Sequence, residues 1–287
     1  MTERDLDETG FTPLFDGRTL AGWHPAPRVL GTMWPGGPQL QAEVVGHGPV
    51  DRATAEAHPA AWWVEDGAIV GAQDAPGSGF GGYLVSDSVH ADFELRLQMN
   101  PDWPADSGVM LRRRRDSWEG LQVLVDHRRG GSIGGFYGNG LAGFHAVDFV
   151  VDAAFDADGR AVGLVEQDPA TTLEPVTPEK RALLARSGTA EEFLAAWRFG
   201  DWNDLRVRCV GEVPVLTTWV NGVLVAELET AAIDWPHFDP EDLRRTLGAA
   251  GHLAFEVHDN DPLLGPERWG AGAVCRWRDI RIRDLSA

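Results

Sequence analysis

The stretch ADFELRLQMN, residues 91–100, decides the fold. Its apolar side chains fall at every second position and polar ones fall between them, so that one face carries Phe93, Leu95, Leu97 and Met99 and the other Glu94, Arg96 and Gln98. Side chains of a β-strand point alternately to opposite faces, and a period of two is therefore typical of a strand with one face in a core. This segment predicts such a strand.

Segments on both sides of this strand repeat the pattern. Residues 107–115 (SGVMLRRRR) and 119–127 (EGLQVLVDH) follow it, and strand patterns resume at 202–211, 217–228, 251–260 and 275–285. Asp66-Gly67 and Asn221-Gly222 separate apolar runs and predict tight hairpin turns. Many short strands with frequent turns are typical of an all-β sandwich.

Two segments interrupt the strand rhythm. Residues 25–60 are rich in Pro, Gly and Ala and predict a long loop, and residues 144–200 predict a small helical insertion. Within the second segment, Thr177-Pro178 opens one helix, and Thr189 with Glu192 forms a capping box for another. Neither strand set alone can close two sheets. We therefore expect residues 1–287 to form one sandwich domain with insertions at 25–60 and 144–200.

Charge and composition limit the partners. A net charge of −19 argues against nucleic acids and anionic membranes, which require a basic surface, whereas neutral sugars remain compatible. The N-terminus has no apolar signal segment and no run is long enough to span a membrane, so we expect a cytoplasmic protein. Cys209 and Cys275 lie in strand-like runs, which predicts buried core residues. The sequence does not indicate the oligomeric state.

The glycine-rich run at residues 130–143 (GGSIGGFYGNGLAG) does not predict a phosphate-binding loop. It lacks the terminal lysine and the following helix that such loops need. We expect a flexible wall beside a site.

Eight segments in a fixed order resemble one family. They are LFDGRTLAGW (14–23), WWVEDGAIVG (62–71), DFELRLQ (92–98), SGVMLR (107–112), LQVLVD (121–126), GDWNDLRVRCVG (200–211) with the VNG turn (220–222), GHLAFEVH (251–258) and WRDIRIRDL (277–285). Together the chain resembles the 3-keto-disaccharide hydrolase family. The resemblance implies a concanavalin-like jelly-roll β-sandwich and, as substrate, a glycoside oxidised to a ketone at C3.

One departure from the family pattern bears on activity. Family members usually carry Glu two residues before the Gln of the LQVLVD strand, and here that position is Gly120. Glu119 is adjacent, but strand alternation turns it to the opposite face unless a bulge intervenes. The family's Asp after this strand aligns with either Val125 or Asp126.

A candidate site follows from alternation on the concave face of such a fold. Polar side chains on one face of its central strands would line a sugar groove. Gln122 shares a face with Asp126, and Glu256 shares a face with His258. With Arg112 at the end of a third strand, these residues would place carboxylates, an imidazole and a guanidinium around one hollow.

The implied chemistry assigns roles to these five residues. A C3 ketone acidifies the C2–H bond, so a base can remove that proton, the C1–O bond can break by elimination, and water can add to the product. We expect His258 or Asp126 as the base and Glu256 as the acid. Arg112 and Gln122 would bind the substrate and stabilise the enolate oxygen. No cofactor is indicated with certainty, and a divalent metal on Asp126, Glu256 and His258 is the alternative.

Three rival functions remain open at this stage. A non-catalytic carbohydrate-binding module has the same fold, and the absence of Glu at position 120 favours it. An ordinary glucanase would need an E-x-D-x-x-E strand, which no segment supplies. A partner-binding role could use residues 178–198, where Phe193, Ala196 and Trp197 form an apolar stripe, although such a stripe more often packs on its own domain.

Overall fold

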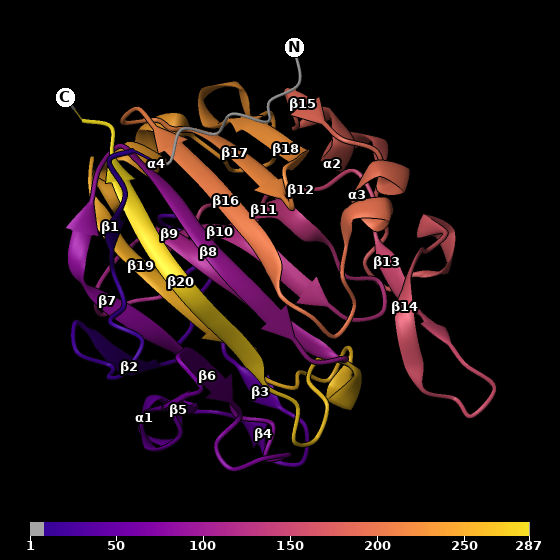
Figure 1. Cartoon of the computed structure of the whole chain (residues 1–287). Coiled ribbons are helices and arrows are strands. Elements are labelled where there is room, and N and C mark those ends of the chain that lie inside the picture. Colours follow the sequence, from indigo (N-terminus) through magenta and orange to yellow (C-terminus); the bar gives the residue numbers. More distant parts are fainter. Residues whose placement is uncertain (1–8, 287) are drawn as a thin grey trace.

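The computed structural model describes residues 9–286, which form two large antiparallel sheets packed face to face (Figure 1). The larger sheet has the order β15 (Arg186–Ser187), β18 (Val223–Glu229), β17 (Val215–Val220), β16 (Asn203–Val210), β8 (Phe93–Pro101), β20 (Cys275–Asp284), β6 (Ala68–Ala72) and β5 (Ala61–Glu65), and β1 (Thr12–Pro13) adds to β20. The predicted Asn221-Gly222 turn joins β17 to β18, and Asp66-Gly67 joins β5 to β6.

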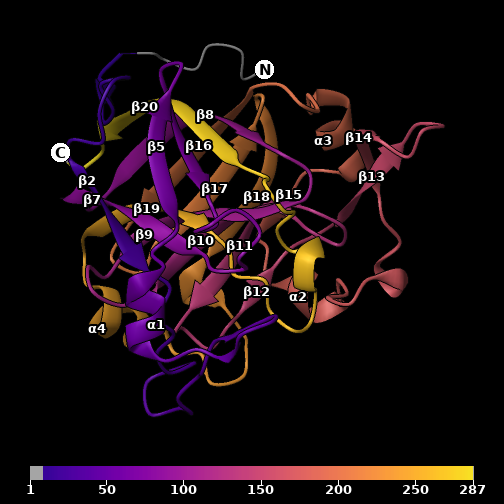
Figure 2. The same cartoon turned by 90° about the horizontal axis from the view of Figure 1, so that it is seen from below.

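The smaller sheet has seven strands and carries the candidate site. Its order is β12 (His145–Ala146), β11 (Ile133–Asn139), β10 (Gly120–His127), β9 (Ala105–Arg113), β19 (Gly251–Val257), β7 (Gly82–His90) and β2 (Trp23–Pro27). Viewed from below, β9, β10, β11 and β19 lie in a layer beside the one that holds β8, β16 and β20 (Figure 2). The predicted all-β jelly-roll sandwich is confirmed.

Alternation along the strands separates the core from the outer face. Leu121, Val123 and Val125 of β10 point inward and pack in one cluster with Leu95 of β8 and Trp277 of β20. The intervening positions of β10 therefore point outward, away from the larger sheet. The buried inner faces of the two sheets supply the main hydrophobic core, and the outer face of the smaller sheet is left for polar residues.

The segment predicted as a loop at 25–60 contains short elements. After β2 come the hairpin β3 (Glu43–Val44) and β4 (Gly48–Pro49), and then helix α1 (Arg52–Ala57), which is capped by Asp51. Residues between β2 and β3 lie over the outer face of the smaller sheet, where several of them line a cavity. This segment thus contributes to the candidate site.

The segment 144–200 contains both helices and strands. Its elements are β12, the hairpin β13 (Val151–Phe155) and β14 (Ala161–Glu166), the 3-10 turn η1 (Pro169–Thr171), α2 (Pro178–Ala182), β15 and α3 (Ala190–Ala196). Thr177 caps α2, and the Thr189–Glu192 capping box of α3 is present, as predicted. Phe193 is buried against Phe149 and Trp197. The apolar stripe of α3 is therefore used within its own domain.

The glycine-rich run lies beside the candidate site, as predicted, but part of it is a strand and not a flexible loop. Residues 133–139 are strand β11, whose Ile133 and Phe136 lie in the core. A Cβ at Gly138 would lie 2.4 Å from the Phe144 ring, so glycine permits close packing at this position. The prediction of flexibility was wrong because these glycines serve strand packing.

The remaining features concern the C-terminal half and the cysteines. Two 3-10 turns and a helix connect the late strands: η2 (Thr230–Ala232), α4 (Pro240–Leu247) and η3 (Gly265–Glu267).

Cys209 and Cys275 are buried and unpaired within the described chain, as predicted. Among residues 9–286, the helices are all too short or too polar to cross a membrane.

Candidate active site

A cavity of about 440 Å³ lies on the outer face of the smaller sheet. Its floor comes from β9, β10 and β11, and its walls come from residues 28–43 and the segment 258–268 that follows β19. The volume lies within the range of about 300–1,000 Å³ typical of small-molecule sites. Of the five residues predicted for the site, Gln122, Asp126 and His258 line this cavity.

Glu256 lies just beneath the cavity and is bound to Gln122. The Gln122 amide donates from Nε2 to Glu256 Oε2 over 2.6 Å, and its Oε1 accepts from Asn139 over 2.8 Å. Gly108 of β9 makes this contact across the strand possible, because a Cβ there would lie 2.4 Å from the Gln122 Nε2 atom. The structure thus brings together four of the five predicted residues.

Arg28 connects three acceptors at the edge of the cavity. Its guanidinium donates from Nε to Glu256 Oε1 (2.9 Å) and from Nη1 to Asp259 Oδ2 (3.0 Å), and its Nη2 lies 3.0 Å from His258 Nε2. The side chain of Arg28 is only 11% exposed. Burial raises the pKa of Glu256, and the nearby Arg28 opposes that shift.

Both ring nitrogens of His258 are engaged. Nδ1 lies 2.7 Å from the carbonyl oxygen of Asp259, and Nε2 faces the Arg28 guanidinium. Since an imidazole that accepts from arginine at Nε2 must be neutral there, Nδ1 carries the proton and donates to the carbonyl. Burial and the charge of Arg28 lower the pKa of His258 well below its ordinary value. His258 is therefore a neutral residue that helps to orient Arg28.

Asp106 of β9 forms the centre of a second ionic network. It accepts from Arg128 Nε over 2.5 Å and from Arg268 Nη1 over 2.6 Å. Arg128 also binds Glu174 (2.6 Å), and Arg268 binds Asp261 (2.6 Å). The two guanidinium groups outweigh the cost of burial and hold the pKa of Asp106 well below its usual range. Asp106 is ionised at neutral pH.

Asp126 lies directly opposite Asp106 on the neighbouring strand. Its Oδ1 is buried and has no hydrogen-bond partner among the described residues. Burial, followed by the negative charge of Asp106, raises the pKa of Asp126 well above its ordinary value. The cavity therefore contains a carboxyl group with a raised pKa beside the ionised Asp106, with which its protonated form can share a hydrogen bond.

Three further buried polar atoms of the lining lack a protein partner within residues 9–286. They are Trp118 Nε1, His145 Nε2 and Arg268 Nε. Buried polar groups are normally hydrogen-bonded, so donors and acceptors left over at a cavity indicate that the occupant is polar. Hydroxyl groups suit this set because each can both donate and accept.

A scan against protein-family models matches residues 10–283 to the 3-keto-alpha-glucoside-1,2-lyase-like domain. The chain belongs to this family. The resemblance found in the sequence is thus confirmed across nearly the whole domain. A search of curated proteins gives no match.

Solved structures similar to this chain include two candidate glycosyl hydrolases of Parabacteroides distasonis. One is 15% identical with a TM-score of 0.48, covering 100% of this chain and 98% of the other. The second is also 15% identical, with a TM-score of 0.43 and coverage of 78% and 90%. A carbohydrate-binding module from Bacillus subtilis is 11% identical with a TM-score of 0.39, covering 78% of this chain and 92% of that one.

Arg112 does not belong to the candidate site. Its side chain is buried elsewhere and donates to Ala91 O (2.9 Å) and Asp92 (3.0 Å). The backbone of Arg112 has a φ of 50°, which interrupts the strand alternation on which its prediction depended. Arg113 takes the outward position instead and lies 4.5 Å over the Tyr83 ring. The prediction that Arg112 contacts the substrate was wrong.

A side chain at Gly120 would crowd its neighbours and require them to move. A Cβ at this position would lie 2.8 Å from Met110 Cε and 3.2 Å from Arg113 Cα. Glu119 does not substitute for it, because its carboxylate hydrogen-bonds Ser117 outside the cavity lining. The Asp that the family carries after this strand aligns with either Val125 or Asp126. Val125 lies in the core and Asp126 lines the cavity, so Asp126 is the residue that can take part in the site.

Asp126, Glu256 and His258 do not form a metal-ligand set. Glu256 binds Arg28 and Gln122, and Arg28 also occupies Nε2 of His258. No group of three or more His, Cys, Asp or Glu side chains within residues 9–286 is arranged to hold a metal ion. The residues present do not fit the predicted metal site, and we derive no step through a metal.

Sequence reasoning missed most charged residues of the cavity. The missed charged residues are Arg28, Glu43, Asp106, Arg128, Glu174, Asp259, Asp261 and Arg268, and Tyr137 and His145 were missed as well. Arg28 lies in a segment without periodicity, and Glu174 follows η1 in the insertion. Asp106 had a usable signal: it lies two residues before Gly108, so regular alternation places both on the same face of the strand.

Proposed function

We propose that this chain cleaves the glycosidic bond of 3-keto-glycosides by elimination, followed by hydration of the product. Membership of the 3-keto-glucoside lyase-like family supports this reaction class. The unpartnered polar atoms of the cavity support a hydroxylated ligand. The observation that carries the proposal is Asp126, whose free oxygen and raised pKa belong to the same carboxyl group.

The reaction requires one proton removal and one proton delivery. A base takes the C2 proton, and the electron pair of that bond forms an enolate with the C3 carbonyl. The enolate then collapses: the C3 carbonyl reforms, a C1–C2 double bond forms, and the C1–O bond breaks with its electrons on the leaving oxygen. A proton on that oxygen completes the leaving alcohol. Addition of water across the C1–C2 bond gives the free 3-keto sugar, with no net oxidation.

In this proposal Asp126 is the base. A carboxylate of ordinary pKa binds a proton too weakly to remove one from carbon efficiently. A raised pKa brings the proton affinity of the carboxylate closer to that of the carbon acid. Burial supplies most of that increase, and the negative charge of the ionised Asp106 on the paired strand adds to it. His258 is the weaker candidate because both of its nitrogens already have partners.

Tyr137 is the proposed acid for the leaving oxygen. It lines the cavity from β11 and lies directly opposite Gln122. Burial raises the pKa of Tyr137 above its ordinary value, so its hydroxyl keeps its proton at neutral pH and can donate it. Glu256, predicted as the acid, instead accepts from Arg28 and Gln122 and fixes their positions.

Arg28 and Arg268 replace Arg112 in stabilising the enolate. Both guanidinium groups line the cavity, and each is held by carboxylates that fix its orientation. Positive charge that is already oriented lowers the energy of a developing anion without reorganisation during the reaction.

A chromogenic substrate tests the proposal. Release of 4-nitrophenol from 4-nitrophenyl 3-keto-α-glucoside should be saturable and should fail with the corresponding unoxidised glucoside, which lacks the acidic C2–H bond. Cleavage of both substrates at similar rates would contradict elimination.

Gly120 favours one rival, a non-catalytic carbohydrate-binding module. The glutamate usual at this position is absent, and a side chain there would require Met110 and Arg113 to shift. Binding of the 3-keto-glucoside by calorimetry, without any release of 4-nitrophenol, would establish this alternative in place of the lyase.

A further inference from the structure

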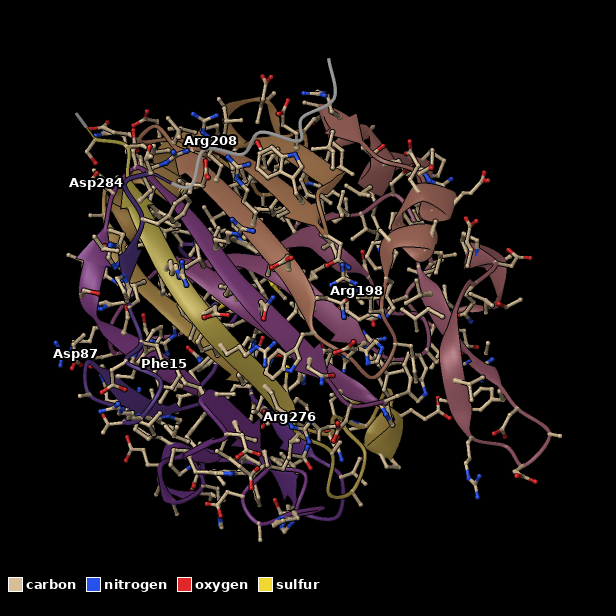
Figure 3. All side chains as sticks on the ribbon, viewed as in Figure 1. Phe15, Asp87, Arg198, Arg208, Arg276 and Asp284 are labelled. Carbon is tan, nitrogen blue, oxygen red and sulfur yellow. The ribbon has the colours of Figure 1, made fainter. Side chains whose placement is uncertain are left out.

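A second cavity opens at the end of the sandwich, on the other side of β10 from the candidate active site. Its volume is about 760 Å³, and its lining includes Asp102, Trp103, His127, Phe199 and Arg276. Arg276 near the start of β20 marks this end of the molecule in Figure 3. His127 directly follows Asp126 in the chain, so neighbouring residues of one strand contribute to two separate cavities.

Three rings form one wall of the second cavity. The Trp103 ring meets His127 edge-on with centroids 5.1 Å apart, and Phe199 lies 5.3 Å from His127. Trp103 and Phe199 are 6.5 Å apart and inclined at 45°. Both of these side chains are only partly buried. Partly exposed aromatic faces inclined to one another can contact the C–H groups of a ring that enters between them.

His127 brings a polar atom to this aromatic wall. The Nδ1 atom lies 2.9 Å from the carbonyl oxygen of Asp102, to which it donates. Nε2 is then an acceptor, and it is buried without a hydrogen-bond partner among residues 9–286. The whole residue is 1% exposed. A buried acceptor of this kind calls for a donor from a ligand or from water.

An ion pair lies next to the aromatic wall. Arg276 Nη1 donates to Asp102 Oδ1 over 2.8 Å, and Asp102 Oδ2 accepts from the backbone of Val274 over 3.0 Å. The Arg276 side chain is 32% exposed. The cavity therefore presents an oriented guanidinium beside aromatic faces, with its charge balanced by Asp102.

We infer that this second cavity binds a neutral sugar unit without cleaving it. A pyranose offers a C–H face for Trp103 and Phe199 and hydroxyl donors for His127 Nε2. The balanced charge gives no advantage to an anion, and the buried acceptor disfavours a purely apolar ligand. Because the two cavities share no lining residue, we expect that a sugar held here does not reach Asp126. The site would hold a second part of a glycan or a second molecule.

Two tryptophans allow each cavity to be observed separately by NMR. Trp103 lines the second cavity and Trp118 the first, so their indole N–H signals, assigned with Trp103→Phe and Trp118→Phe, report on one site each. Methyl α-D-glucopyranoside is the probe, since it lacks the C3 ketone and should not be cleaved. We expect a saturable shift of the Trp103 signal, whatever happens at Trp118.

Variants test whether the aromatic wall and the guanidinium cause that shift. Phe199→Ala should weaken binding at the Trp103 signal roughly three- to tenfold, the usual contribution of one aromatic contact. Arg276→Met should weaken it as well. The matched control Phe155→Ala removes a Phe that is 57% exposed in β13 and should change nothing.

Three results would overturn the inference. They are an absence of saturable shift at Trp103, an equal effect of Phe199→Ala and Phe155→Ala, and a shift produced by phenol but not by the sugar. The last result would assign the cavity to aromatic ligands. None of these depends on turnover at the first cavity, so failure here leaves the proposed lyase activity unaffected.

Discussion

Asp126 and Asp106 lie directly opposite each other on β10 and β9, and their environments differ sharply. Arg128 and Arg268 hold Asp106, whereas Asp126 Oδ1 has no partner in the described chain. The pKa of Asp106 is lowered and that of Asp126 is raised. Two carboxyl groups whose proton affinities are driven apart in this way are typical of catalytic sites.

Asp126→Asn should abolish most of the cleavage. If Asp126 removes the C2 proton, release of 4-nitrophenol from the 3-keto-glucoside should fall about 10²- to 10⁴-fold, with little change in substrate binding. Asp66→Asn is the matched control, since Asp66 lies in a hairpin turn with a φ of 48°, which asparagine tolerates. A loss below tenfold would exclude Asp126 as the base.

The stability of Asp126→Asn should differ from wild type in a pH-dependent way. The folded pKa of Asp126 is above 3.8, so the folded state holds this proton more tightly than the unfolded chain. The resulting stabilisation is complete below pH 3.8 and is lost as the pH rises to the folded pKa. Asp126→Asn does not undergo this pH-dependent loss of stability. Between pH 3.8 and the folded pKa, its free energy of unfolding should therefore rise relative to that of the wild type, by at most about 1.4 kcal/mol per pH unit. Urea unfolding of both proteins from pH 4 upward measures the difference. A constant difference would contradict the raised pKa.

Removing the opposite carboxylate should mainly destabilise the fold. Asp106→Asn leaves the guanidinium groups of Arg128 and Arg268 without the acceptor between them, and breaking a buried ion pair costs about 3–5 kcal/mol. Asp279→Asn removes an exposed carboxylate 3.7 Å from Arg281 and should cost less than about 1 kcal/mol. Urea unfolding at pH 7 compares the two. Similar losses would mean that the Asp106 network contributes little to stability.

Alternation predicted the parts of the site that lie on regular strands. Gln122 and Asp126 share the outward face of β10, and Glu256 has the same orientation on β19, so each followed from counting positions. Arg112 failed because its positive φ breaks the count at the end of β9. The four consecutive arginines at residues 112–115 gave no sequence signal for such a backbone conformation.

Contacts between segments far apart in the chain could not be predicted from the sequence pattern. Arg28 meets Glu256 across 228 positions of the chain, and it lies in a segment whose course is set by tertiary packing. Arg268 reaches Asp106 from the connection before β20 for the same reason. The fold was predictable because strand patterning is local, whereas these ion pairs depend on where connections cross the sheet.

Gly108→Ala should damage the site by filling the space that Gln122 needs. The new Cβ would lie 2.4 Å from Gln122 Nε2, so the hydrogen bond from Gln122 to Glu256 must shift or break. Overpacking of this kind costs about 1–3 kcal/mol, and substrate affinity should fall with it. Gly163→Ala in β14 is the control, because its Cβ meets only Ala154 at 3.9 Å. Urea unfolding and the KM for the 3-keto-glucoside report the two effects, and equal behaviour of both variants would contradict the packing argument.

Tyr137→Phe should affect substrates according to their leaving groups. If the Tyr137 hydroxyl protonates the leaving oxygen, its loss should slow cleavage of an alkyl 3-keto-glucoside about 10²-fold or more, because an alkoxide leaves poorly without a proton. 4-Nitrophenolate is stable as an anion, so release from the nitrophenyl substrate should be nearly unchanged. Equal losses for both substrates would instead indicate that Tyr137 only shapes the cavity. His145→Gln is a suitable comparison, since His145 packs edge-on against Tyr137 with centroids 5.8 Å apart. With its pKa lowered to about 3, His145 is an uncharged imidazole at neutral pH and cannot act as an imidazolium acid. It should not discriminate between the two leaving groups.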